Sequence, residues 1–202
     1  MVVAHPAPAP ELPDVRRLVT RAESPVAHIV PAALRAIARE AERSHDGLET
    51  GGILLGPDIA DTIVISRAGD PGPRAHRTEH SFLRDLAHAQ SLANTAWNED
   101  GHQWIGEWHT HPTGDLTPSA LDLHSYLQHL HDPELHLDWF VAIIVGLTPD
   151  AGITTAAWLI ERHRVRALSL DTTIDEEQSA KHSARQPQHR TRTDRHTGTG
   201  QR

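Results

Sequence analysis

The sequence predicts an α/β layered domain, and two features of the chain carry this prediction. Segments in which apolar residues recur at helical spacing alternate with short apolar runs that are typical of buried strands. The length of 202 residues suits one domain with its own core plus disordered ends. We expect the domain over residues 25–168, between a Pro/Ala-rich leader (1–24) and a polar, Arg/His-rich tail (169–202) without hydrophobic periodicity.

The first half of this domain is expected to contain two helices and two strands. Leu34, Ile37 and Ala41 recur at helical spacing, and Gly47 follows them as a stop signal. Two apolar runs separated by a turn signal then predict strands, and a longer periodic segment predicts a helix. In chain order, the expected elements are a helix (31–44), two strands (51–55 and 62–66) and a second helix (82–97).

The second half is expected to contain three strands and one helix. Two continuous apolar runs flank a Thr-Pro-Asp turn at 148–150, which is the pattern of strands buried on both faces. In chain order, the expected elements are a strand (103–109), a third helix (118–131) and two strands (139–145 and 153–160).

A histidine motif lies where the strand at 103–109 meets the third helix. It reads His109-Thr110-His111-Pro112 and is followed by Ser119 and Asp122. Residues two apart on an extended segment project to the same side, so the two imidazoles can converge on one ion. Thr117-Pro118 resembles an N-cap followed by Pro at the first helical position, which places Ser119 and Asp122 one helical turn apart.

The specificity of this motif comes from its whole pattern. The chain has 17 histidines, so about one or two His-x-His pairs are expected by chance. A second such pair, His129 and His131, lies in the expected third helix, where positions two apart do not share a face, and we interpret it as solvated surface. With the additional Pro, Ser and Asp at fixed spacing, the probability that the whole pattern arises by chance from this composition is roughly one in a few thousand.

Two imidazoles and one carboxylate are ligands that suit Zn²⁺, and three protein ligands leave the fourth tetrahedral position for water. A structural zinc site would normally be completed by cysteine, which this chain lacks. Zinc lowers the pKa of bound water to about 7, but a protein base must still move the proton. We therefore expect one Zn²⁺ per chain in a hydrolytic site.

Two glutamates compete for the role of the base. Glu107 shares the face of His109 and His111 if the strand is regular, whereas Glu49 lies far upstream in Glu-Thr-Gly-Gly-Ile-Leu-Leu-Gly. Glu107 is equally suited to orienting a histidine ring, which metal-bound imidazoles usually require. Spacing alone leaves both assignments open.

Together these residues resemble the JAMM signature of the JAB/MPN/Mov34 zinc metalloprotease family: an upstream glutamate, then His-x-His-Pro, six residues and Ser-x-x-Asp. The run Gly106-Glu107-Trp108-His109-Thr110-His111-Pro112 is especially similar to the prokaryotic branch, and the resemblance covers roughly residues 25–165. It implies a JAB/MPN-like (cytidine-deaminase-like) fold, a mixed curled β-sheet flanked by helices. It further implies zinc ligation by His109, His111 and Asp122, acid/base catalysis by Glu49 and oxyanion stabilisation by Ser119. Glu107 keeps its interpretation as a group that orients a ring.

The resemblance implies hydrolysis of the peptide or isopeptide bond after the C-terminus of a ubiquitin-like modifier. The expected partners are that modifier and its conjugate, with E1-like and E2-like enzymes of the same system. One alternative is a peptidase acting on a sulfur-carrier protein or its aminoacyl adduct, and another is a non-catalytic scaffold. The stretch between Asp122 and Trp139 is too short for the large ubiquitin-recognising insertion of eukaryotic deubiquitinases, so ubiquitin itself is not the expected substrate.

Composition excludes several other classes. The net charge of −8 argues against a nucleic-acid binder, which needs a basic surface. The chain has no cysteine, which excludes thiol catalysis and thioester carriage by its own residues. It also has neither an 18-residue apolar run nor a signal-peptide pattern, so we expect no membrane span and a cytoplasmic location.

Two further groups of residues have expected positions. Trp104 and Trp108 alternate along the strand that carries the histidines, and we expect both in the core rather than in a substrate site. The segment 74–82, with His76, Arg77 and His80, fits either a substrate groove or a polar connection, and the sequence favours neither.

Overall fold

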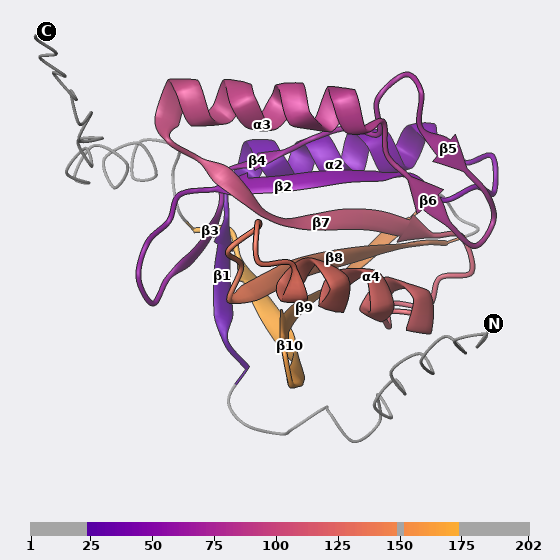
Figure 1. Cartoon of the computed structure of the whole chain (residues 1–202). Helices are drawn as coiled ribbons and strands as arrows, with labels where there is room; N and C mark the ends of the chain where they lie inside the picture. Colours follow the sequence, from indigo (N-terminus) through magenta and orange to yellow (C-terminus); the bar gives the residue numbers. More distant parts are fainter. Residues whose placement is uncertain (1–23, 149–151, 174–202) are drawn as a thin grey trace, which may run out of the picture.

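The expected alternation of helices and strands is confirmed in a curled, mixed β-sheet flanked by helices (Figure 1). The computed structural model describes residues 24–148 and 152–173. Most of the expected leader and tail, and Pro149 and Asp150 of the expected turn, lie outside these residues.

The described elements follow one another in the order strand, helix, and then strands interrupted by two more helices. The helices are α2 (Pro31–Arg43), α3 (Leu86–Asp100) and α4 (Ala120–His131). The strands are β1 (Val26–Ile29), β2 (Gly51–Gly56), β3 (Ile63–Ile65), β4 (Arg67–Ala68), β5 (His76–Arg77), β6 (Phe82–Leu83), β7 (Gln103–His111), β8 (Trp139–Leu147), β9 (Ile153–Glu161) and β10 (Arg164–Asp171).

The main sheet has eight strands in the order β3-β1-β10-β9-β8-β7-β2-β4, and β5 and β6 form a separate hairpin. β1 pairs in parallel with β3 and β10, and β7 pairs in parallel with β8, while the other pairs are antiparallel. β3 and β4 are separated only by Ser66, yet they lie at opposite ends of the strand order. The Ser66 amide donates to the Leu55 carbonyl at 2.9 Å, so the sheet curls until its two edges approach each other.

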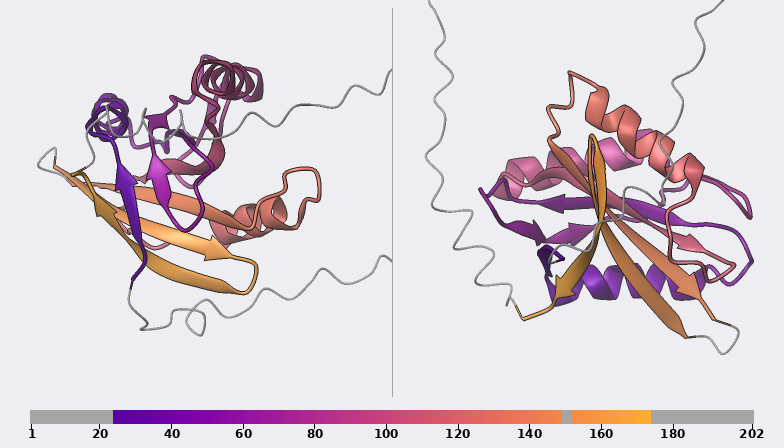
Figure 2. Two further views of the ribbon diagram at one scale, coloured as in Figure 1. Left: turned by 90° about the vertical axis from the view of Figure 1, so that its left-hand side faces the viewer. Right: turned by 90° about the horizontal axis from the view of Figure 1, so that it is seen from below.

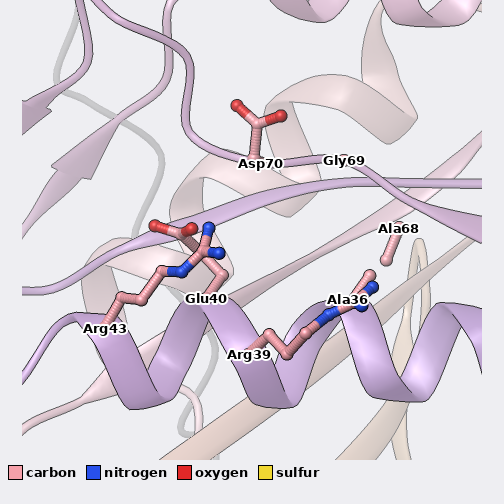
Figure 3. A pocket seen from close by; sticks show the side chains of 7 residues that line it. All are labelled: Ala36, Arg39, Glu40, Arg43, Ala68, Gly69 and Asp70. Carbon is pink, nitrogen blue, oxygen red and sulfur yellow. The ribbon is translucent and has the colours of Figure 1, made fainter.

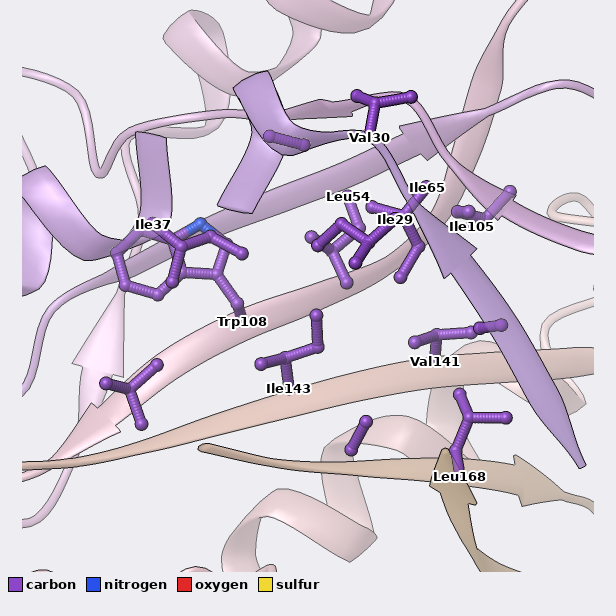
Figure 4. Packing of buried hydrophobic residues seen from close by; sticks show 14 of the residues in the cluster. Ile29, Val30, Ile37, Leu54, Ile65, Ile105, Trp108, Val141, Ile143 and Leu168 are labelled. Carbon is purple, nitrogen blue, oxygen red and sulfur yellow. The ribbon is translucent and has the colours of Figure 1, made fainter. Parts of the chain in front are cut away.

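The inner face of the curled sheet holds the largest core cluster (Figure 4). Ala33, Ile37 and Ala41 of α2 face it, because they recur at helical spacing. The sheet contributes mainly branched aliphatic residues and one tryptophan, among them Leu54, Ile105, Trp108, Val141, Ile143 and Leu168. Burial of this apolar surface fixes α2 against the strands, at about 25 cal/mol per Å² removed from water.

The outer face carries α3 and α4. Ala96 of α3 packs on Ile53 and Leu55, the neighbours of the inward-facing Leu54. Leu123, Tyr126 and Leu130 of α4 pack on Phe140, Ala142, Ile160 and Val165. Figure 2 shows α2 and α4 on opposite sides of the strands. The alternation of side chains along β2 and β8 therefore builds two layers of core from single strands.

The start of α3 differs from the expected one. The periodic pattern placed a helix from residue 82, but Phe82 and Leu83 form β6, and the helix begins at Leu86. Asp85 fixes this start, because its carboxylate accepts hydrogen bonds from the amides of Ala87 and His88 at 3.2 and 3.3 Å. At the other end Gly101 has φ +70°, a left-handed conformation that suits glycine at a helix C-cap.

Five strands of the structure, namely β1, β4, β5, β6 and β10, were not among the expected elements. β10 has two buried residues, Val165 in the outer core and Leu168 in the inner core, and continues past residue 168 to Asp171. β1 is short and pairs on both sides with strands distant in sequence.

Within the described ranges, no helix is both long enough and apolar enough to cross a bilayer.

Candidate metal centre

Three side-chain atoms converge at the junction of β7 and α4. Nε2 of His109 and Nε2 of His111 lie 3.0 Å apart, and each lies 3.5 Å from Oδ2 of Asp122. The two histidines are buried, at 3% and 7% exposure, and Asp122 is half-buried. The structure therefore brings together all three predicted ligands as a group that could hold a metal ion.

The strand and the helix each place their ligands for a simple reason. His109 and His111 are two residues apart on β7 and project from its outer face, while Trp108, the residue before His109, belongs to the inner core. Asp122 is the third residue of α4, so its side chain points back toward the helix start. The loop between them turns at Gly114, whose φ is +78° and whose amide donates to the His111 carbonyl at 3.0 Å.

The N-cap of α4 is Ser119, which corrects the expected cap at Thr117. Ser119 Oγ accepts a hydrogen bond from the Asp122 amide at 3.2 Å, and the Ser119 amide donates to Asp122 Oδ2 at 2.7 Å. This reciprocal capping box satisfies two helix-terminal donors. The same two residues thus start the helix and orient the carboxylate ligand.

A backbone carbonyl orients the ring of His111. Its Nδ1 lies 2.7 Å from the carbonyl oxygen of Asp115, to which the protonated nitrogen donates. Nε2 is then the nitrogen with a free lone pair, and it is the one that faces Asp122. Burial lowers the pKa of His111, but the hydrogen bonds that the protonated ring donates to Asp122 and Asp115, together with the negative charges of Asp122 and Glu49, outweigh burial and raise that pKa above its usual value.

Asp122 is held as a carboxylate. Burial by itself raises its pKa, but hydrogen bonds from His109, His111 and Ser119 leave the pKa of Asp122 far below the usual range. The group is therefore ionised and ready to bind a cation at neutral pH.

The pairing of β2 with β7 brings Glu49 to the same place. Gly51 is the register partner of His109, and the amide of Thr110 donates to the Thr50 carbonyl at 2.8 Å. A Cβ atom on Gly51 would lie 2.2 Å from the Trp108 carbonyl oxygen, so glycine permits this close approach. Glu49 precedes this paired segment, and its residue is only 8% exposed.

The electrostatic surroundings of Glu49 fit a proton carrier. Burial raises the pKa of its carboxyl above the usual value, and the positive potential of His109 and His111 lowers it by less. The group therefore exchanges its proton closer to neutral pH than an exposed glutamate does.

Glu107 also projects to this side of β7, but its carboxylate forms an ion pair with Arg84, at the end of the β5–β6 segment. Both side chains are largely buried, at 13% and 16% exposure. The ring partner that the structure provides for His111 is the Asp115 carbonyl, which has no signature in the sequence.

Two hollows meet at Glu49. The first, which we call the apolar hollow, has a volume of about 420 Å³ and includes Glu49, His109 and Asp122 in its wall. The exposed leucines Leu83, Leu86 and Leu121 also line it. The second, the polar hollow, has a volume of about 250 Å³ and is lined by Glu49, Glu79, His80, His111, Pro112, Thr113, Asp115, Thr117, Pro118 and Ser119. The ligand cluster thus lies between an apolar and a polar recess.

A third hollow, of about 310 Å³, lies between α2 and β4 (Figure 3). Its charged lining residues are Arg39, Glu40, Arg43 and Asp70, and its wall contains none of the predicted site residues. It is separate from the ligand cluster.

The tryptophans of β7 end on opposite faces of the sheet. Trp108 is 1% exposed in the inner core, as expected, but Trp104 is half-buried and packs with the outer clusters. The register shift opposite Leu54 and Leu55 inserts one extra residue in β7 and reverses its alternation.

Trp104 also covers His129 edge-on at 5.0 Å between ring centroids. His129 is therefore half-buried and lines the apolar hollow, which corrects its interpretation as solvated surface, whereas His131 is exposed.

The match to known families decides the classification. Residues 30–161 match the family of prokaryotic homologs of the JAB domain. This chain belongs to that family. A probable metalloprotease of Sinorhizobium fredii is 31% identical over 156 residues, covering 71% of this chain and 94% of that protein. The name of that JAB-domain relative implies a metal, as the ligand cluster does.

Other JAB-domain relatives are named for their reaction. The CD-NTase/cGAS isopeptidase of Vibrio cholerae is 33% identical over 100 residues, which is 48% of this chain and 62% of that protein. A protein of Escherichia coli with the same name is 31% identical over 81 residues. These relatives support a metalloprotease or isopeptidase activity.

A solved structure supports the fold. The solution structure of a Desulfitobacterium hafniense protein superposes with a TM-score of 0.55 at 19% identity, covering 74% of this chain and 95% of that one.

Proposed function

We propose that this chain is a zinc-dependent isopeptidase that hydrolyses the bond between the C-terminus of a modifier protein and an amine of its target. The observation that carries the proposal is the convergence of two imidazole nitrogens and one carboxylate oxygen beside a buried glutamate. The names of the JAB-domain relatives support the reaction class.

The donor set fits zinc. Zn–N and Zn–O bonds of about 2.0–2.2 Å in tetrahedral geometry place ligand atoms about 3.3–3.6 Å apart. The three observed separations are 3.0, 3.5 and 3.5 Å. Two imidazoles and one carboxylate match the ligands of catalytic zinc sites that keep one position for water. His109, His111 and Asp122 would hold the ion.

When bound, zinc lowers the pKa of a coordinated water and polarises the substrate carbonyl. Glu49 lies in the wall of both hollows, so its carboxyl can take a proton from water and later give it to the leaving amine. Ser119 Oγ uses a lone pair to accept the Asp122 amide, which leaves its own hydrogen to donate toward the oxygen that gains negative charge. Pre-positioned donors of this kind stabilise charge that develops only in the transition state.

The two hollows suit a polypeptide that crosses the ligand cluster. We place the modifier's C-terminal segment in the apolar hollow, beside Leu83, Leu86 and Leu121, and the target's amine in the polar hollow. α4 ends at His131 and β8 begins at Trp139, so only a short link joins them. This short link supports a modifier other than ubiquitin.

The relatives' names favour a particular conjugate. Several of them are CD-NTase/cGAS isopeptidases, so we propose an isopeptide conjugate containing a CD-NTase as the first substrate to test. A ubiquitin-like protein joined to a lysine amine is the second. A sulfur-carrier adduct is the third, and cleavage of that substrate alone would assign the chain to precursor processing.

The test compares the wild type with Glu49→Gln on these three conjugates. Gln keeps the shape of the side chain but cannot accept and release a proton near neutral pH, so we expect the cleavage rate to fall by about 10²–10⁴-fold with zinc content unchanged. The matched control is Glu42→Gln, an exposed carboxylate of α2 that lines none of the three hollows, which should leave the rate unchanged.

The other outcomes are equally informative. Equal cleavage by wild type and Glu49→Gln would reject Glu49 as the proton carrier. A folded wild type that takes up no stoichiometric zinc and cleaves none of the conjugates would point to a scaffold. His109→Ala should lose both zinc and activity, because two ligands bind the ion far more weakly than three.

A further inference from the structure

The backbone that carries Glu49 is held by one arginine from a different part of the chain. Arg77, in β5, donates from Nε to the Glu49 carbonyl at 2.9 Å and from one terminal nitrogen to the Leu48 carbonyl at 3.2 Å. Its two terminal nitrogens also bind both carboxylate oxygens of Asp46, at 2.9 and 3.0 Å. One guanidinium thus binds three of the four residues from Asp46 to Glu49.

The hairpin adds a bond of its own to the same residue. The Glu49 amide donates to the carbonyl of Thr78, the neighbour of Arg77, at 2.8 Å. The hairpin is closed in turn by Thr78, whose amide donates to the Ser81 carbonyl at 2.9 Å. Both polar groups of the Glu49 peptide backbone are therefore bound to the β5–β6 segment.

We propose that Arg77 is a positioning residue, which fixes the backbone of Glu49 so that its carboxyl faces the ligand cluster. Glu49 precedes β2 and lies outside the strand ladder, which begins at Gly51. Without an external clamp, the loop after α2 would let the side chain move away from the ligands. The inference rests on the proposed function, in which Glu49 moves the proton.

The chemistry of arginine suits this task. A guanidinium has five donors in a planar fork, so it can bind a carboxylate with two bonds and still reach two carbonyls. A lysine has the same charge but no fork and cannot span the same acceptors. The Arg77 side chain is 23% exposed, and its bonds to the Glu49 and Leu48 carbonyls are partly buried, whereas its pairing with Asp46 is exposed to water.

The same segment also forms part of the substrate wall. The apolar hollow is lined on one side by Ser81, Phe82, Leu83 and Arg84. Arg77 lies on the opposite strand of the hairpin, where it is the register partner of Phe82. The hairpin therefore connects a wall of the hollow to the backbone of the proton carrier. Segment 74–82 fits both interpretations of the sequence, because His80, Ser81 and Phe82 line the hollows and Arg77 is a polar connection to the site.

The test uses Arg77→Lys, with Arg74→Lys as the matched control. Arg74 lies in the same segment and pairs with Asp85 at 3.1 Å, but its side chain is 73% exposed and it contacts neither Glu49 nor Leu48 in any described hydrogen bond. Hydrogen exchange measured by mass spectrometry on full-length protein should show about tenfold faster exchange at residues 46–50 in Arg77→Lys. Arg74→Lys should leave that segment unchanged.

Kinetics on the conjugate that the wild type cleaves provide the second readout. We expect kcat of Arg77→Lys to fall by roughly 100-fold, with KM within about twofold and zinc content unchanged, because a small displacement of the proton carrier affects the chemical step. Asp46→Asn keeps the Arg77 bonds to the carbonyls, so its kcat should fall by less than that of Arg77→Lys. It also serves as the second variant if Arg77→Lys unfolds.

The outcomes separate this inference from the proposed function. Unchanged exchange at residues 46–50 in both variants overturns the clamp. Faster exchange with unchanged kcat shows a structural contact only and overturns the positioning role. If the wild type cleaves no conjugate, the proposed function fails, and exchange alone then decides whether Arg77 holds the Glu49 backbone.

Discussion

A single backbone oxygen, the carbonyl oxygen of Asp115, determines which nitrogen of His111 can bind a metal. Both of its ring nitrogens have polar neighbours, but Nδ1 donates to the Asp115 carbonyl and Nε2 faces Asp122 and His109. A carbonyl accepts but cannot donate, so it fixes the tautomer as well as the ring orientation. The residue therefore presents one lone pair at the ligand cluster.

The raised pKa of His111 predicts a pH-dependent zinc affinity. Metal binds the neutral ring, so a proton must leave as zinc binds. Because the pKa of His111 in the metal-free protein lies above its usual value of 6.5, competition should begin near neutral pH and grow as pH falls. We expect affinity to fall by about tenfold per pH unit below that pKa, measured by competition with a chromogenic chelator.

The control for this prediction is His124→Gln, which removes an exposed histidine of α4. Its affinity should follow the same pH dependence as the wild type. A wild-type affinity that stays constant from pH 8 to pH 6 would contradict the assignment of His111 as a ligand that binds protons in competition with zinc.

At the scale of elements, the first turn of α4 performs two tasks. Ser119 caps the helix, and Asp122 completes both the capping box and the ligand cluster. A helix start offers free amides that favour a carboxylate, so the same geometry stabilises the helix and holds the ligand. This explains why a serine precedes the carboxylate by three residues.

Two substitutions of Ser119 separate capping from catalysis. Ser119→Ala should lower the unfolding free energy by about 1 kcal/mol and Ser119→Gly by only a few tenths, because glycine is a tolerable N-cap. Both remove the hydroxyl, so both should lose activity by about 100-fold at saturating zinc. Denaturant unfolding and cleavage rates measure the two effects. If Ser119→Gly keeps nearly wild-type activity and only Ser119→Ala loses activity, the activity loss follows the stability loss. That result would show that Ser119 acts only as a helix cap.

At the scale of the whole molecule, the curl of the sheet assembles the site from distant segments. The loop before β2 supplies Glu49, β7 supplies the histidines, and α4 supplies Asp122 from the outer layer. These segments meet only when the β2–β7 ladder and the outer core are formed. The unfolded chain therefore lacks the preassembled ligand cluster.

Zinc should stabilise the folded molecule for this reason. A ligand that binds only the folded state adds RT ln(1 + [L]/Kd), or about 2.7 kcal/mol at a hundredfold excess over Kd. We expect Tm to rise with zinc in the wild type and in His45→Gln, an exposed histidine outside the site, and to stay constant in His109→Ala. An equal rise in His109→Ala would place the binding elsewhere. Calorimetry with and without a chelator measures this zinc-dependent change in Tm.

The sequence by itself determined the α/β class and the three candidate ligands. Helical and strand periodicities located the three helices and the strands from Gly51 to Glu161 that have a clear pattern. The ligands could be named because they are local: two lie on one strand and the third is in the first turn of the next helix. Short-range geometry of this kind follows from fixed backbone periods.

Only the tertiary structure decided how Glu49, Arg77 and the two tryptophans are placed. Their positions depend on strand register, on a bulge opposite Leu54 and on bonds to backbone carbonyls. β1 was missed for a related reason, since it pairs only with β3 and β10, which are distant in sequence. Ladder register and carbonyl positions arise from packing of the whole chain, and no residue type encodes them.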